Sequence, residues 1–249
     1  MLNALIFDVD GTLANTERDG HRVAFNHAFA DAGLDWKWDV AIYGDLLSVT
    51  GGKERIRYFI EKYDPQLPKT SDLIDWIASL HKAKTMHYVR MLREGMIPLR
   101  PGVKRLIQEA RQQHITLAIA TTTTLENVIE LLKSTLGAES PDWFACIAAG
   151  DIVPAKKPAP DIYHYALDEI KRDVEECLAL EDSYNGLQSA LGAGLQTLVT
   201  LNDYTRKDDF SGAKAVLDHL GEPDLPCRTF VGPQPQLGWV DLEYLKQLV

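Results

Sequence analysis

The feature that most constrains the fold is the start of the chain, where an apolar run ends in two aspartates. Residues 2–7 are mostly apolar and have the length of a strand buried on both faces, as in a parallel sheet. Asp8 and Asp10 follow directly, and ligands of open α/β sheets bind just beyond the carboxyl ends of strands. Two carboxylates there repel each other unless a divalent cation lies between them. The sequence therefore predicts a cation site at the end of this strand.

Charge and composition exclude several classes of partner. The formal net charge of −10 argues against nucleic acid or an anionic membrane as the binding partner, because proteins that bind these partners need an excess of Lys and Arg. No apolar run approaches the roughly 20 residues of a membrane helix, and the N-terminus lacks the basic segment of a signal peptide. The cysteines Cys146, Cys177 and Cys227 have the spacing of neither a zinc site nor a disulfide framework. We expect a cytoplasmic protein whose partner is a small molecule, with no obligatory protein partner.

Residues 16–96 have the pattern of helices alone. Helices are expected over residues 16–32, 39–49, 53–63 and 71–92. A crossover between parallel strands needs only a dozen or more residues, so this insert is far too long to be one. We expect a helical domain at residues 16–96, inserted into a core domain of residues 1–15 and 97–249.

The second half alternates strands with helices. Strands are expected over residues 115–120, 144–149, 177–180 and 196–201, and helices over 101–113, 124–136, 160–171 and 183–193. This alternation predicts an α/β fold with a doubly wound, Rossmann-like parallel sheet and right-handed crossovers. A strand over 213–217 is expected at the edge of the sheet. A tail rich in Pro and Gly follows from Gly221 and ends in a short helix over 241–248.

Four threonines follow the strand over 115–120 and precede a helix. A hydroxyl together with free backbone N–H groups at a helix N-terminus can bind an anion. One of the four can instead be an N-cap, but all four cannot. We therefore expect an anion site at Thr121, Thr122 and Thr123.

The remaining predicted strand ends carry a lysine and two more acids. Lys157 precedes Pro158 at the start of a predicted helix, where its ammonium can lie beside a phosphate and a carboxylate; its neighbour Lys156 is the weaker candidate. Glu181 and Asp182 end the strand over 177–180, although Asp or Ser also commonly caps the next helix. These two acids would complete an oxygen cage for Mg²⁺.

In order and spacing these residues resemble the four motifs of the haloacid dehalogenase superfamily. The insert resembles the helical cap of the subgroup that contains β-phosphoglucomutase and many sugar-phosphate phosphatases. The similarity is closer still to the CbbY-type phosphatases, which share segments matching residues 11–17, 50–56, 81–85, 120–123, 156–163 and 180–186.

The resemblance implies a covalent mechanism on the aspartate pair. Asp8 would attack phosphorus to give an aspartyl-phosphate, and Asp10 would protonate the leaving oxygen and then deprotonate the hydrolytic water. Mg²⁺ would be held by the Asp8 carboxylate, the Asp10 backbone carbonyl and Asp182, with Glu181 bound directly or through water.

The same resemblance assigns the phosphoryl oxygens to other residues. Thr121, the N–H of Thr122, and Lys157 would hold these oxygens while charge redistributes.

The helical insert is expected to select the substrate. Gly51 and Gly52 before Lys53 and Arg55 predict a second anion site at a helix start, although such cations often simply face solvent. Two anion sites suit a bisphosphate.

Further candidates in the insert follow from the resemblance. They are Glu17, Tyr43, His81 and Lys84, with His21 weaker, and ordinary packing is the alternative for each. Trp36 and Trp38 are expected to pack in the insert rather than contact a ligand.

The resemblance implies a phosphorylated sugar as substrate, such as the pentulose bisphosphate xylulose-1,5-bisphosphate. Two alternatives stay open: a β-phosphoglucomutase-like mutase and a non-catalytic protein that binds phosphosugars. The Thr-Gly-Gly-Lys-Glu-Arg segment stands where the mutase cap has a Val-Ser-Arg loop, which favours hydrolysis.

Overall fold

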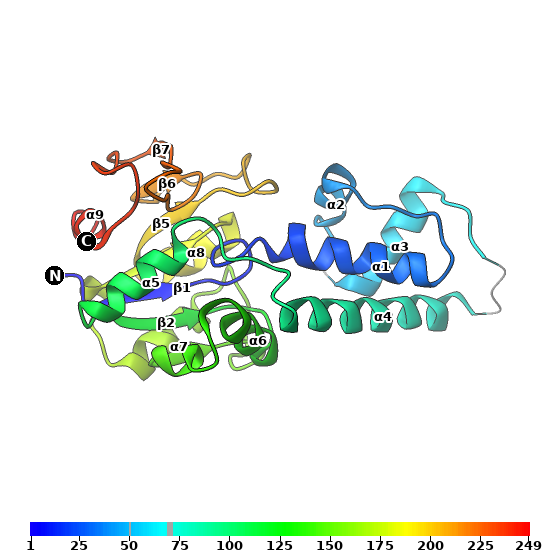
Figure 1. Ribbon diagram of the computed structural model, residues 1–249, viewed down its shortest axis with the longest axis horizontal. Coiled ribbons are helices and arrows are strands. Elements are labelled where there is room, and N and C mark those ends of the chain that lie inside the picture. Colours follow the sequence, from blue (N-terminus) through cyan, green and yellow to red (C-terminus); the bar gives the residue numbers. More distant parts are fainter. Residues whose placement is uncertain (50, 69–71) are drawn as a thin grey trace. The chain divides into compact units, whose positions relative to one another are not determined.

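The computed structural model describes residues 1–49, 51–68 and 72–249 and divides into two compact units (Figure 1). The sheet unit comprises Met1–Asn15 and Pro98–Val249, and the helical unit comprises Thr16–Ile97. The predicted helix start at residue 71 and the first residue of the 50–56 segment lie outside the described residues. The domain boundaries predicted from the sequence stay a prediction.

Within the described residues the sheet unit contains a seven-stranded sheet with the order β3-β2-β1-β4-β5-β6-β7. The first six strands are parallel, and β7 pairs antiparallel with β6. All four residues of β1 are buried, as expected for a strand covered on both faces. The strands are β1 Ala4–Phe7, β2 Thr116–Ala120, β3 Cys146–Ala148, β4 Cys177–Glu181, β5 Gln196–Thr200, β6 Ala215–Leu217 and β7 Thr229–Val231.

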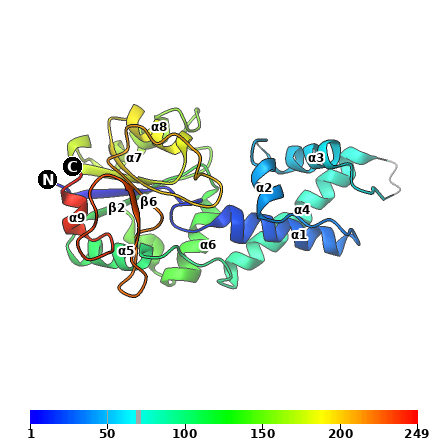
Figure 2. The same cartoon turned by 90° about the horizontal axis from the view of Figure 1, so that it is seen from above.

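Helices cover both faces of this sheet. In Figure 2, α7 and α8 lie on one side of the strands, and α5 and α6 lie on the other. Small strand residues, such as Ala118 and Ala179, form the core beneath α7 and α8. This arrangement confirms the predicted doubly wound α/β fold. The helices are α5 Val103–Gln112, α6 Leu125–Leu136, α7 Asp161–Ile170 and α8 Tyr184–Gly192, with short 3₁₀ segments at Ser140–Trp143 and Val174–Glu176.

The strand predicted over 213–217 is present, but its predicted place at the edge of the sheet was wrong. That segment forms β6, which lies between β5 and β7 and is buried. The outer strand β7 was missed because its three residues lie in a segment rich in Pro and Gly, too short for an alternating pattern to be visible. Tertiary pairing with β6, not local sequence, forms it.

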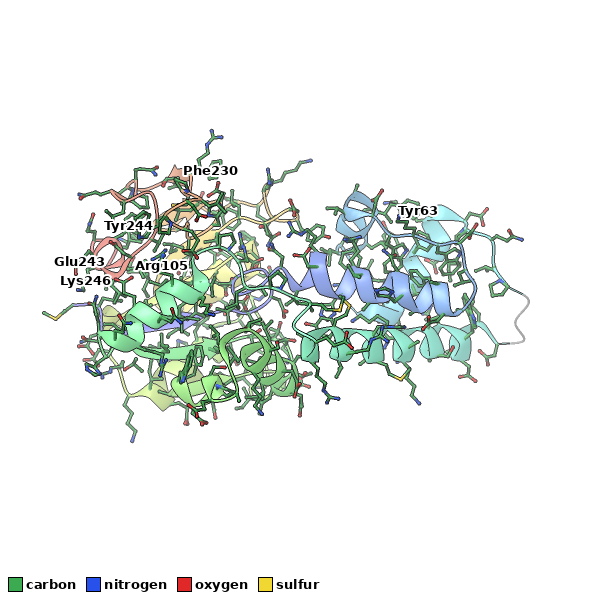
Figure 3. The ribbon with its side chains drawn as sticks, viewed as in Figure 1. Tyr63, Arg105, Phe230, Glu243, Tyr244 and Lys246 are labelled. Atoms are coloured by element: carbon green, nitrogen blue, oxygen red, sulfur yellow. The ribbon has the colours of Figure 1, made fainter. Side chains whose placement is uncertain are left out.

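The C-terminal helix α9, Leu242–Lys246, lies within the predicted range 241–248. The Asp241 side chain caps it by accepting a hydrogen bond from the Tyr244 N–H at 2.7 Å. Leu242 and Leu245 are fully buried, whereas Glu243 and Lys246 form an exposed ion pair of 2.6 Å (Figure 3). The tail is therefore part of the folded sheet unit.

The helical unit is built around an aromatic core. Trp36 and Trp38 are buried, and both pack against Phe29 and Phe59, as packing residues should. The helix predicted over 16–32 begins with a π-helical turn, η1 Thr16–His21. The other helices are α1 Arg22–Asp31, α2 Val40–Leu46, α3 Gly52–Tyr63 and α4 Leu73–Arg93. In the described part of the chain, no helix is both long and apolar enough to cross a membrane.

Candidate active site

Parallel pairing brings the predicted residues of the sheet unit to one edge. The register pairs Phe7 with Leu180 of β4 and with Ile119 of β2, so Asp8 emerges beside Glu181. β1 and β4 are neighbours in the sheet but not in the chain. This reversal of strand order is the place where open α/β sheets bind ligands.

Lys157 connects the strand ends electrostatically. Its Nζ lies 2.7 Å from Asp8 Oδ1 and 2.6 Å from Glu181 Oε1, and it donates to the Ala120 carbonyl at 2.9 Å. Burial alone would lower the pKa of Lys157, but the two carboxylates outweigh burial and raise it above its usual range. The lysine is therefore a permanent buried cation.

Three carboxylates form a compact acidic cluster: Asp8, Glu181 and Asp182 each offer an oxygen within 4.8 Å of the others. All three are at most 6% exposed. Burial raises the pKa of Glu181 to about 7, and burial together with Asp8 and Glu181 raises the pKa of Asp182 well above its usual range. Lys157 supplies one positive charge against three acids, so a divalent cation would balance the cluster, and oxygen ligands of this kind suit Mg²⁺.

The Glu181 carboxylate is held firmly in this cluster. Besides the bond from Lys157, Oε1 accepts a hydrogen bond of 2.6 Å from the buried Tyr163 hydroxyl. Gly186 makes room on the other side, because a Cβ there would overlap the Glu181 carboxyl group. Ser183, not Asp182, caps α8 by accepting from the Gly186 N–H at 3.1 Å. Glu181 and Asp182 therefore do not cap α8, which was the alternative role for an acid at this position.

The threonine segment lies at the start of α6. Thr121 is fully buried, and its Oγ1 accepts a hydrogen bond of 3.3 Å from the Thr123 N–H. Thr124 occupies the N-cap position, but within the described residues its side chain makes no capping hydrogen bond. Thr122 is exposed and Thr123 partly so. The N-terminus of α6 therefore retains the capacity to bind an anion.

Asp10 lies two residues beyond Asp8 at the same end of β1. It is partly buried, and its backbone forms an isolated bridge with Ala14. Its predicted role as acid and base stays a prediction.

In the helical unit, the structure brings together three candidates from different elements. The Tyr43 hydroxyl donates to Glu17 Oε2 at 2.5 Å, and Arg55 Nη1 donates to the Tyr43 oxygen at 3.0 Å. Arg55 Nη1 also lies 3.5 Å from Glu17. Burial opposes ionisation of Glu17, but His21, Arg55, the Tyr43 hydroxyl and Lys84 together hold its pKa below the usual value. An ionised carboxylate and a guanidinium therefore lie side by side.

A second group in this unit centres on Lys84. Its Nζ lies 2.8 Å from His21 Nδ1, and it faces the rings of Phe25 and Tyr88 at 5.1 and 5.2 Å. Burial and the neighbouring ammonium lower the pKa of His21 to about 3, so the neutral imidazole accepts the hydrogen bond. His21, the weaker candidate from sequence, is thus a direct partner of Lys84.

The N-terminus of α3 is crowded. A Cβ at Gly52 would come within 2.5 Å of the His81 ring, and one at Gly51 would overlap the Glu54 carboxylate. Lys53 is exposed and His81 partly buried. Because a carboxylate of the chain itself lies at this helix start, the predicted anion site would have to compete with it. Its role stays a prediction.

Sequence reasoning missed three contributors to the sheet-unit site. Tyr163, whose hydroxyl donates to Glu181, is an apolar-face residue of α7 and carries no sequence signal for this contact. Asn202, which donates to Asp182 Oδ2 at 2.6 Å, is a polar residue just after β5, and the strand-end rule would have found it. Arg100 binds backbone carbonyls, for which the sequence offers no signal.

Comparison with known proteins shows the family of this chain. The model of the haloacid dehalogenase-like hydrolase family matches residues 2–194, and the chain belongs to that family. Within it, the chain is a phosphatase of the CbbY type. It is 45% identical over 245 residues to the plasmid CbbY protein of Cupriavidus necator, covering 98% of this chain and 96% of that one. It is 49% identical over 225 residues to CbbY of Cereibacter sphaeroides, covering 89% and 94%.

Two solved structures of CbbY from Rhodobacter sphaeroides are similar to this chain over most of its length. One, in complex with phosphate, has a TM-score of 0.72 at 48% identity and covers 88% of this chain and 95% of its own. A mutant in complex with xylulose-(1,5)bisphosphate has a TM-score of 0.73 at 48% identity and covers 90% and 96%.

Proposed function

We propose that this chain is a Mg²⁺-dependent phosphatase of sugar bisphosphates that acts through an aspartyl-phosphate on Asp8. The observation that carries the proposal is the buried ammonium of Lys157 between Asp8 and Glu181, with Asp182 completing the acidic cluster. A carboxylate is a competent nucleophile toward phosphorus when its charge is compensated.

Each residue of the strand ends has a task in this proposal. Asp8 attacks phosphorus, and the bond to the leaving sugar oxygen breaks as Asp10 protonates that oxygen. Asp10 then accepts a proton from water, whose oxygen attacks the phosphorus and frees Asp8 and inorganic phosphate. Thr121, the Thr122 N–H and Lys157 hold the phosphoryl oxygens.

The proposed Mg²⁺ ligands are the carboxylates of Asp8 and Asp182 and the Asp10 backbone carbonyl, with Glu181 bound directly or through water. When bound, the cation would neutralise Asp8 and the phosphoryl oxygens. The burial of three carboxylates beside a single ammonium supports this assignment, because a divalent cation would offset the negative charge that Lys157 leaves.

We assign the second phosphate of the substrate to the helical unit, through Arg55 and Lys84. Both cations are held by neighbouring side chains, which lowers the entropy lost when a phosphate binds. The xylulose-1,5-bisphosphate bound by a relative supports a pentulose bisphosphate as the substrate.

A phosphate-release assay with Mg²⁺ over sugar mono- and bisphosphates tests the proposal. We expect the fastest release from xylulose-1,5-bisphosphate and none after Asp8→Asn. Product analysis on β-glucose 1-phosphate separates hydrolysis from transfer of the phosphoryl group: glucose 6-phosphate as the main product would replace the phosphatase with a mutase.

A further inference from the structure

The side chain of Asn202 lies between the end of β5 and the acidic cluster. Its Nδ2 donates to Asp182 Oδ2 at 2.6 Å, and its Oδ1 accepts a hydrogen bond of 2.8 Å from the Tyr204 N–H. A backbone N–H can only donate, so it determines which end of the amide is oxygen. The side-chain NH₂ group of Asn202 therefore faces Asp182.

Gly11 encloses the same carboxylate oxygen from another side. A Cβ at Gly11 would overlap Asp182 Oδ2 and come within 2.8 Å of Asn202 Nδ2, and its φ of +90° is itself one that favours glycine. Asp182 Oδ2 is thus held between a peptide unit and an amide. The rotation of this carboxyl group is restricted before any cation binds.

The buried guanidinium of Arg100 binds both segments that contact Asp182, the loop at Gly11 and the segment at Asn202. Arg100 donates to the Gly11 carbonyl, to the Leu201 carbonyl at 2.5 Å and to the Asp218 carbonyl at 2.7 Å. The residue is 6% exposed. The loop that carries Gly11 and the strand end that carries Asn202 are therefore anchored to one cation, which makes the contact with Asp182 a built feature of the sheet unit.

We infer that Asn202 is a positioning residue that orients Asp182 for Mg²⁺. The inference rests on the proposed function, since it takes Asp182 as a ligand. A hydrogen-bond donor behind a metal-binding group fixes its orientation, and removing such a partner typically weakens metal binding about 10- to 100-fold. The amide does this without adding charge to the cluster.

The alternative is that Asn202 serves only the turn after β5. Its side chain closes that turn through Tyr204, and its own N–H donates to Thr205 Oγ1 at 3.2 Å. Asn202→Ser separates the two roles. A serine hydroxyl can still accept from the Tyr204 N–H, as in turns closed by Ser or Thr, but it is too short to reach Asp182.

The test is calorimetric titration of metal-free wild-type protein, Asn202→Ser and the control Thr205→Ala with MgCl₂. The Thr205 substitution loosens the turn and leaves the donor to Asp182 in place. We expect about 10- to 100-fold weaker Mg²⁺ binding for Asn202→Ser and wild-type affinity for Thr205→Ala. With saturating Mg²⁺, the kcat of Asn202→Ser should return close to the wild-type value, which a general loss of structure would not permit.

Three results would overturn the inference. Equal Mg²⁺ affinity of Asn202→Ser and wild type would remove the positioning role, and an equal loss in Thr205→Ala would assign the effect to the turn. Wild-type protein that binds no Mg²⁺ would instead overturn the proposed function, and the inference with it. Circular dichroism checks that each variant is folded. If Asn202→Ser does not fold, Asn202→Thr takes its place, because a threonine hydroxyl can accept the same hydrogen bond in the turn.

Discussion

Replacing Lys157 by Met removes the cation from the acidic cluster while nearly preserving side-chain length. The Lys157 side chain is 8% exposed and lies 2.7 Å from Asp8 and 2.6 Å from Glu181, so solvent screens these pairs little. Breaking a buried ion pair by removing one partner costs about 3–5 kcal/mol. We expect a loss of this size in the free energy of unfolding of the metal-free protein, together with loss of phosphatase activity.

The loss should grow with pH. The pKa of Glu181 is raised to about 7 even beside Lys157, so the native state retains a proton that the unfolded chain releases above its ordinary pKa of 4.5. Stability falls with rising pH through this window. Without the lysine the pKa of Glu181 rises further, and the window extends to higher pH.

The assay is urea unfolding in EDTA at about pH 6 and about pH 8, beside the control Lys156→Met. Lys156 carries the same charge one residue earlier, but its side chain is 42% exposed and pairs with the exposed Asp151, so about 1 kcal/mol or less is expected. Equal stability of the two variants, or a deficit of Lys157→Met that shrinks at higher pH, would show that Lys157 does not stabilise the acidic cluster.

Two predictions concern the helical unit. Arg55→Met and Lys84→Met should reduce kcat/KM for xylulose-1,5-bisphosphate far more than for p-nitrophenyl phosphate, and equal losses would remove these residues from substrate selection. Because the pKa of His21 is lowered to about 3, the free energy of unfolding of the wild type should fall as pH drops below 6.5. His21→Gln should remove about 2 kcal/mol of that fall by pH 5. Urea unfolding measures this, and an unchanged pH dependence in the variant would contradict the prediction.

Most site residues of the sheet unit could be predicted from the polar residues that follow apolar, strand-like runs. Asp8 and Glu181 stand in segments whose apolar runs mark strands, and parallel pairing necessarily brings such ends to one edge. Lys157 was predictable as well, because the proline that follows it restricts its backbone at the entry to a predicted helix.

Other contacts could not be predicted because their partners leave no local pattern. Arg100 binds carbonyls, which every residue possesses, and Lys84 meets a histidine 63 residues away across two helices. Strand β7 exists only through its pairing with β6. In each case tertiary packing, not periodicity or propensity, determines the contact.

In the proposed mechanism the phosphoryl group passes through a covalent bond to Asp8. The direct test is a single turnover of xylulose-1,5-bisphosphate with Mg²⁺, quenched in acid, reduced with borohydride and mapped by mass spectrometry. Borohydride converts an aspartyl-phosphate to homoserine, so we expect homoserine at position 8 in the wild type and none in Asp8→Asn. Phosphate release without a modified residue 8, or with the modification elsewhere, would contradict this mechanism.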